Sequence, residues 1–180
     1  MPDHRCIDED CRHLQDLNIS RNQGKITDES LALVAMNCRN LQTLDVSSPQ
    51  GDITDVSMKL VALNCRQLRS LNIQDTEGKI TDDSIALVAT NCRRLCHLNV
   101  SGAKGKITNE SVKLLAANCL QLQSLDVSCT KVNDESIKLV AVNCRQLRDL
   151  RACETRGITE ASLSLLQGCC STVSGTYTEY

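Results

Sequence analysis

The chain has almost no aromatic residues. Its 180 residues include no Trp or Phe, and its two Tyr are Tyr177 and Tyr180. A hydrophobic core must therefore be built from Leu, Ile, Val, Ala and Cys. Such small side chains suit a fold that stacks thin, identical layers better than one that packs around a single centre. The lack of aromatic side chains for base stacking also argues against a single-stranded nucleic acid as ligand.

Strong net charge and long apolar runs are absent as well. The formal net charge is -2, which gives no reason to expect non-specific attraction to nucleic acid or to an anionic membrane. No apolar run approaches the roughly 18 to 20 residues of a membrane span, and residues 1–10 lack the apolar centre of a signal peptide. We therefore expect a cytoplasmic or nuclear protein with no membrane or nucleic-acid partner.

A cysteine-centred element recurs along the chain. Cys11, Cys38, Cys65 and Cys92 are 27 residues apart, and the frame continues at Cys119, Cys144 and Cys170 with spacings of 25 and 26 for the last two intervals. This predicts six repeats of 25–27 residues over 11–170. We interpret residues 1–10 as a partial repeat or remnant cap, and 171–180 as a C-terminal capping strand or tail.

Each repeat contains the pattern of a short strand and then that of a helix. Leu41, Leu44 and Val46 show the alternation of a strand with one buried face, whereas Ile26, Leu31 and the apolar residues up to Cys38 follow helical spacing. N-caps are predicted at Thr27, Thr54, Thr81, Thr108, Asn133 and Thr159. Helix ends are predicted at residues that tolerate a left-handed conformation, namely Asn37, Asn64, Asn91, Asn118 and Asn143.

Units of this length close as coils of a solenoid, with parallel strands on one side and helices on the other. The pattern Leu-x-x-Leu-x-Val…Ile-Thr-Asp…Leu-x-x-Val-Ala-x-Asn-Cys resembles the cysteine-containing leucine-rich repeats best known from F-box substrate receptors of ubiquitin ligases. The fold class implied is α/β, a leucine-rich-repeat solenoid or horseshoe with a parallel concave sheet and convex α-helices.

The chain departs from this family's pattern in two ways. Where the general motif has Asn or Cys in the turn after the strand, the chain has Asn22, Pro49, Thr76, Ala103, Thr130 and Thr155. No F-box is present, since only ten residues precede Cys11. We therefore expect little of a polar ladder in that turn, and no docking to a ligase through this chain alone.

Catalytic, cofactor and metal sites are not expected. The repeat cysteines are distributed along an axis rather than around one point, so we interpret them as small core residues. Cys96, Cys129 and Cys153 lie outside the repeat pattern and are either reactive thiols or incidental. The three His have no nucleophile elbow, phosphate loop or metal-binding spacing around them, and we predict that the chain is not an enzyme.

The concave face is the predicted binding surface for a protein partner. Period-2 logic selects strand residues that point away from the core. Our candidate partner-binding residues are Asp16, Asn18, Asp45, Asn72, His97, Asn99, Asp126, Asp149 and Arg151. The alternative is a solvated face that repeats Asn, Asp and Ser for solubility and cross-strand hydrogen bonds. The sixth repeat differs most from the others and is the first place to look for selectivity.

Two further columns allow two interpretations each. Arginines follow the repeat cysteine at Arg12, Arg39, Arg66, Arg93 and Arg145, with Arg69, Arg94 and Arg148 beside them. They could grip an acidic peptide or phosphate, although the helix dipole alone favours cations there. Helix residues Leu33, Leu60, Leu87, Leu114, Leu139 and Leu165 form an apolar column. We expect lateral packing between helices rather than an exposed interaction stripe.

The leading functional interpretation is a non-catalytic protein–protein interaction scaffold, which resembles the substrate-recognition repeats of F-box receptors. The alternative is a structural or self-assembling repeat protein or a host-interacting effector. The N-terminal layer has few apolar residues to cover it, so we expect either a fragment of a longer protein or self-association through that end.

Overall fold

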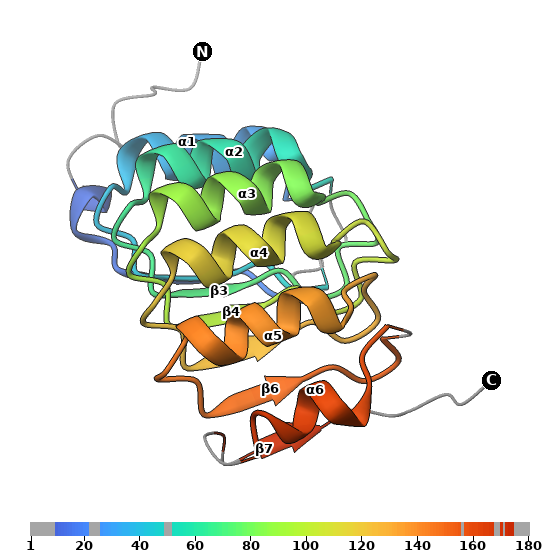
Figure 1. Cartoon of the computed structure of the whole chain (residues 1–180). Helices are drawn as coiled ribbons and strands as arrows, with labels where there is room; N and C mark the ends of the chain where they lie inside the picture. The colour runs from blue at the N-terminus through green and yellow to red at the C-terminus, as the bar shows by residue number, and fades with distance from the viewer. Residues whose placement is uncertain are drawn as a thin grey trace.

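The computed structural model describes residues 10–21, 26–48, 52–155, 157–167, 170 and 172–174. These residues form one parallel sheet in which the strands follow chain order from β1 to β7. The helices lie side by side over one face of the sheet (Figure 1). The strands are β1 Asp16–Asn18, β2 Thr43–Asp45, β3 Ser70–Asn72, β4 His97–Asn99, β5 Ser124–Asp126, β6 Asp149–Arg151 and β7 Thr172–Ser174. The helices are α1 Asp28–Asn37, α2 Asp55–Asn64, α3 Asp82–Asn91, α4 Asn109–Asn118, α5 Asp134–Asn143 and α6 Glu160–Ser164, after a 3₁₀ turn at Asp10–His13.

The strands pair in the register of the repeat. Leu17 lies opposite Leu44, which lies opposite Leu71, and the same column continues to Leu150. Because parallel strands lie about 4.8 Å apart and packed helices about 8 to 10 Å apart, the stack curves with the sheet inside. The predicted leucine-rich-repeat horseshoe, with a concave sheet and convex helices, is confirmed.

The repeat cysteines pack between the layers as core residues. Cys38, Cys65, Cys92, Cys119 and Cys144 are buried. The Cys65 thiol donates to the Cys38 carbonyl at 3.5 Å, and the Cys92 thiol donates to the Cys65 carbonyl at 3.6 Å. Burial raises the pKa of Cys65, Cys92 and Cys119 to about 12. Each thiol therefore both fills the core and links its repeat to the preceding one.

The helix starts match the prediction, but the helix ends do not. The side chains of Thr54, Thr81, Thr108 and Asn133 accept the N–H two residues ahead. The prediction of left-handed Asn residues at the helix ends is wrong, because each Asn is the last helical residue. In the first four helices its Nδ2 donates to the carbonyl four residues earlier, at 2.9 Å. Residues with positive φ lie instead in the loops after the strands. Each of these loops has one at Arg21, Ser48, Asp75, Gly102, Cys129 or Glu154, and Glu77, Gly78, Lys104 and Gly105 are further examples.

The loop position that departs from the family's pattern forms no continuous polar ladder, and the buried Thr76 hydroxyl has no hydrogen-bond partner among the described residues. Thr76, Ala103, Thr130 and Thr155 are buried there, while Asn22 and Pro49 lie outside the described residues. The hydroxyls of Thr130 and Thr155 donate to the Val127 carbonyl, at 2.5 and 3.2 Å. Two of the four described positions thus share an acceptor, and Ala103 has no polar side chain to contribute.

The predicted lateral packing of the helix leucines holds for only part of the column. Leu60 and Leu87 are half-buried and pack against the core. The others remain exposed, from 39% at Leu114 to 54% at Leu165. The predicted end segments fall largely outside the described residues, apart from β7. Within the described part of the chain, no helix combines the length and apolar content needed to cross a membrane.

Candidate functional site

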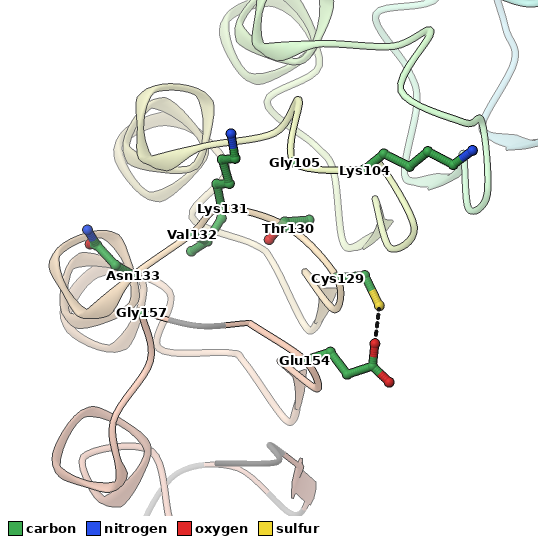
Figure 2. Close-up of a pocket in the computed structure, with 9 residues that line it drawn as sticks. All are labelled: Lys104, Gly105, Cys129, Thr130, Lys131, Val132, Asn133, Glu154 and Gly157. Atoms are coloured by element: carbon green, nitrogen blue, oxygen red, sulfur yellow. Dashed lines mark hydrogen bonds between the residues drawn. The ribbon is translucent and has the colours of Figure 1, made fainter. Parts of the chain in front are cut away.

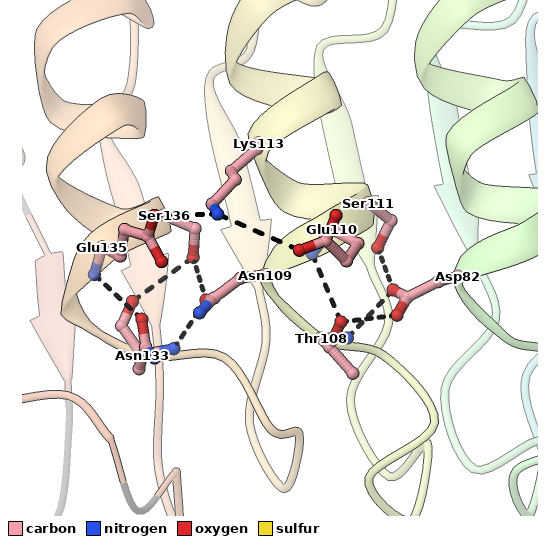
Figure 3. A network of polar contacts seen from close by, with 9 residues as sticks. All are labelled: Asp82, Thr108, Asn109, Glu110, Ser111, Lys113, Asn133, Glu135 and Ser136. Atoms are coloured by element: carbon pink, nitrogen blue, oxygen red, sulfur yellow. Dashed lines mark hydrogen bonds and ion pairs between the residues drawn. The ribbon is translucent and has the colours of Figure 1, made fainter.

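An acidic ladder joins the helix starts of successive repeats (Figure 3). In its central unit, Asp82 accepts the Thr108 N–H at 2.9 Å, the Thr108 hydroxyl at 2.6 Å and the Ser111 hydroxyl. The equivalent acceptors are Asp28, Asp55 and Asp134, and the equivalent buried serines are Ser57, Ser84 and Ser162. These acids therefore bind the next repeat as well as occupying the positive end of a helix.

Burial and hydrogen bonding act in opposite directions on these carboxylates. Burial would raise the pKa of Asp55, but the bonds from Ser84 and Thr81 outweigh it and lower the pKa below its ordinary value. The pKa values of Asp28 and Asp134 are lowered in the same way. These three carboxylates are therefore ionised at neutral pH, and their hydrogen bonds to the next repeat leave them little capacity to bind a partner.

One rung of the ladder carries a matched pair of substitutions. Asn109 replaces the acid, and Asn133 replaces the threonine of the following repeat. Asn109 Oδ1 accepts the Asn133 N–H at 2.9 Å and the Ser136 hydroxyl at 2.8 Å (Figure 3). In the other rungs a threonine hydroxyl donates to the second carboxylate oxygen, whereas Asn109 has an amide nitrogen, which is a donor, in place of that oxygen. Sequence reasoning missed this ladder, although the recurrence of Ser three residues after the cap was its signal.

The candidate binding residues form two columns on the concave sheet face. At the strand starts, Asp16, Thr43, Ser70, His97, Ser124 and Asp149 follow one another in register. At the strand ends, the column is Asn18, Asp45, Asn72, Asn99, Asp126 and Arg151. All are exposed or half-buried, while the leucines between them point to the core. The face is thus polar over its whole length.

The residues of the strand-end column also have a structural role, which the alternation of strand residues does not predict. Oδ1 of Asp45, Asn99 and Asp126 each accepts the N–H of the residue two positions ahead, at 2.9 Å. Asn18 and Asn72 make the same bond. These Asx turns end the strands, and they explain why the column is restricted to Asn and Asp over five repeats. Among these five residues, only Asn99 makes a side-chain bond across the strands, from Nδ2 to Gln74 Oε1 at 3.3 Å.

The sixth repeat leaves this pattern. Arg151 cannot close an Asx turn, and the Cys153 N–H instead donates to the Ser128 hydroxyl of the preceding repeat at 3.1 Å. Arg151 is exposed and forms no ion pair with any residue that the structure describes, although Asp126 lies beside it in register. Its guanidinium is therefore available to a partner.

A shallow hollow of about 210 Å³ lies in the middle of this face. Its lining includes Asn72, His97, Asn99, Asp126 and Arg151, which are five of the nine candidate residues. Asp16, Asn18 and Asp45 lie on β1 and β2, outside the hollow. Asp149 lies on β6 opposite Ser124, and its Oδ1 is buried without a hydrogen-bond partner among the described residues.

A second hollow, of about 680 Å³, lies among the loops that follow the strands (Figure 2). The loop between β5 and α5 is two residues shorter than the loop between β4 and α4, so the surface is notched there. Lys104 and Lys131 line the notch, and the Cys129 thiol points to Glu154 Oε2 at 3.5 Å. In the described part of the chain, no group of three or more His, Cys, Asp or Glu is arranged to hold a metal ion.

The cysteines should differ sharply in reactivity. Cys129 is exposed, whereas Cys92 is buried with its pKa raised to about 12. Burial and Glu154 also raise the pKa of Cys129, yet its sulfur remains accessible. We expect iodoacetamide to alkylate Cys129 at least about 100-fold faster than Cys92 in the native protein, as read by peptide mass spectrometry. Comparable rates at the two thiols would contradict the packing of the cysteine column.

Comparisons with known proteins agree with this architecture. A family model described as Leucine Rich repeat matches residues 10–35 and 118–141. A chain of the yeast Rad7 and Elc1 complex superposes with a TM-score of 0.71 and 18% identity over 81% of this chain and 38% of that chain. Internalin C2 from Listeria monocytogenes str. 4b F2365 superposes with a TM-score of 0.60 and 22% identity over 93% of this chain and 82% of that chain. No curated protein sequence matches significantly.

These likenesses concern the fold, and the Rad7–Elc1 chain is much longer than the part matched. The chain's own features agree with that fold: a buried cysteine follows each of the helices α1 to α5, and the strand leucines stack in register. The chain therefore has the leucine-rich-repeat fold, and its repeats 10–35 and 118–141 match the sequence pattern of that repeat.

Proposed function

We propose that the chain is a protein-interaction scaffold whose concave face recognises a protein segment. The observation that supports this most directly is the hollow across β3 to β6, where an arginine takes the place of the Asn or Asp at the strand end. In five repeats the strand-end residue closes an Asx turn. In the sixth, Arg151 closes no such turn and lies beside Asp126. A cation next to an anion with an uncommitted oxygen can fix the orientation of a partner in a way that a uniform polar face cannot.

The finer proposal is a substrate-recognition module of the F-box-receptor type. The resemblance of the repeats supports it, as does the similarity to a chain from a structure that is itself a two-protein complex. The effector part would then lie on another polypeptide or another segment of a longer protein. Catalysis is not part of this proposal: His97 lies in register between Ser70 and Ser124, but no hydrogen bond joins it to either serine in the described structure.

The test is a selection that does not require the partner to be known in advance. A displayed peptide library is enriched on the wild-type chain and then on the charge-swapped variant Asp126→Arg/Arg151→Asp. We expect enriched peptides whose affinity falls by about tenfold or more on the variant, since surface charges that face a ligand govern both selectivity and association rate.

The matched control is Lys104→Asp/Glu154→Lys, which swaps charges at the loop notch rather than on the sheet. Peptides that lose affinity equally on both variants would point to overall electrostatics and count against the concave site. If the selection yields nothing and the chain sediments as concentration-dependent assemblies unaffected by the sheet variant, the structural alternative replaces this proposal.

A further inference from the structure

One edge of the solenoid carries arginines without carboxylates. This edge is formed by the turns that lead from each helix to the next strand (Figure 1). The turns 36–42, 63–69, 90–96, 117–123 and 142–148 contain seven Arg and no Asp or Glu. A chain with a net charge of only -2 thus has a strongly segregated surface charge.

Helix capping accounts for only part of this arrangement. Arg66 Nε donates to the Leu63 carbonyl at 3.1 Å, and Arg93 Nε donates to the Thr90 carbonyl at 3.2 Å. A guanidinium has five N–H donors, so each of these residues keeps its terminal nitrogens for another acceptor. The helix dipole therefore explains the cation that follows α1, α2, α3 and α5, but not why Arg69 and Arg94 stand beside them.

Three lysines show a contrast with these arginines. Lys59, Lys79 and Lys113 form ion pairs with Asp83, Asp52 and Glu135, at 3.2, 2.8 and 2.8 Å. The edge arginines of repeats two to four, Arg39, Arg66, Arg69, Arg93 and Arg94, form none with the residues that the structure describes. Arg94 bonds a neutral group instead, Gln67 Oε1 at 2.6 Å. These three lysines are thus paired with nearby acids, whereas the five arginines of repeats two to four have no carboxylate partner among the described residues.

The 3₁₀ turn Asp10–His13 and the first of these turns, 36–42, enclose a hollow of about 380 Å³. It is lined by Arg12, Met36, Asn37, Arg39 and Asn40. Asn40 Nδ2 donates to the Arg12 carbonyl at 3.0 Å, which fixes one turn against the other. Met36 is half-exposed at the wall. The hollow can therefore hold a side chain with an aliphatic stem and an anionic end.

We propose that the arginine edge of repeats two to four binds an acidic, extended segment of a partner protein. Successive turns are separated by between about 4.8 Å, the strand spacing, and about 10 Å, the helix spacing. Alternate side chains of an extended peptide are about 6.6 Å apart, within that range. Arginine is suited to bidentate pairing with carboxylates. The run ends at the fifth repeat, where Leu120 takes the arginine position and is 52% exposed.

A protein segment fits this edge better than a nucleic acid. Single-stranded nucleic acid is generally held by aromatic stacking as well as by cations, and the chain has no Phe or Trp. The proposal is independent of the concave face, because the arginine edge is formed by the turns before the strands and the concave face by the strands themselves. Loss of either surface can therefore be detected without affecting the other.

Fluorescence anisotropy with a labelled glutamate-rich peptide tests the proposal. We expect the peptide to bind the wild-type chain with an affinity that falls as salt is added, and to weaken at least about tenfold on Arg39→Gln/Arg66→Gln/Arg93→Gln. The variant Arg39→Lys/Arg66→Lys/Arg93→Lys keeps the charge but loses the planar fork, and should recover only part of the affinity.

The control is Lys104→Gln/Lys106→Gln/Lys131→Gln, which removes the same charge from the opposite edge and should leave peptide binding unchanged. Equal weakening by both triple variants would show that net charge alone is measured and would overturn the proposal. So would tighter binding of duplex DNA than of the peptide through the same arginines. Circular dichroism confirms that each variant remains folded.

Discussion

Replacing Asp82 with alanine is expected to lower the free energy of unfolding by about 3 to 4 kcal/mol. The substitution removes the acceptor of three hydrogen bonds that start from the next repeat. The Ser111 hydroxyl is fully buried and would lose its carboxylate partner. Because hydrogen bonds to a charged acceptor are worth more than neutral ones, this single carboxylate should matter more than a core methyl group. Equilibrium urea unfolding measures the change.

The neighbouring residue provides a matched control. Asp83 belongs to the same helix turn, but its side chain is 75% exposed and pairs only with Lys59 at the surface. Asp83→Ala should cost less than about 1 kcal/mol, since exposed ion pairs and helix-end charges contribute little. Similar losses for both variants would mean that the acids act through the helix dipole, and that the bonds between repeats are unimportant.

The second large effect should be unfolding in alkali. Burial raises the pKa of Cys65, Cys92 and Cys119 from an ordinary value of 9.0 to about 12, and that of Cys144 to about 11. A thiol whose pKa is higher in the folded than in the unfolded state contributes to the free energy of unfolding. That contribution is complete below the pKa of the unfolded chain and is lost as pH rises towards the pKa of the folded protein. The loss should therefore begin near pH 9, where thiols of the unfolded chain start to release protons.

The size of this loss follows from proton linkage. Well above the unfolded pKa, each such thiol costs about 1.4 kcal/mol per pH unit, so four of them should remove about 5 kcal/mol by pH 10. Folded domains are stable by roughly 5 to 15 kcal/mol, and the chain should unfold soon above that pH. Urea titrations under reducing conditions between pH 8 and 10 measure the slope. Cys92→Ala should reduce it by about a quarter, and an unchanged slope would contradict the assignment.

The repeat architecture could be predicted from the sequence because its signals are local. The leucine alternation around Leu44 and the stripe that ends at Cys38 each repeat with a fixed phase, so strand, helix and buried cysteine follow from periodicity. The outward-facing columns follow as well, since a strand alternates its faces. Periodicity thus predicts whether a residue faces the core or the surface.

What a polar residue bonds to could not be predicted in the same way. Asp82 and Thr108 are 26 positions apart, and nothing in the local pattern distinguishes an acid that attracts a helix dipole from one that binds the next repeat. At the helix ends, Asn was expected to adopt a left-handed conformation, whereas its amide reaches a carbonyl one turn back. Both residues satisfy backbone or hydroxyl groups at short range, and several such geometries are compatible with one sequence.

The Asx turns of the concave face have a consequence for how its charge can change. Asn and Asp present the same acceptor oxygen at the same distance from the backbone, so exchanging them preserves the turn. Five positions on this face accept such isosteric exchange, and they carry two negative charges at present, on Asp45 and Asp126. Related chains could therefore present anything from no charge to five on one unaltered backbone. Partner preference could then diverge by single-atom replacements while every strand keeps its place.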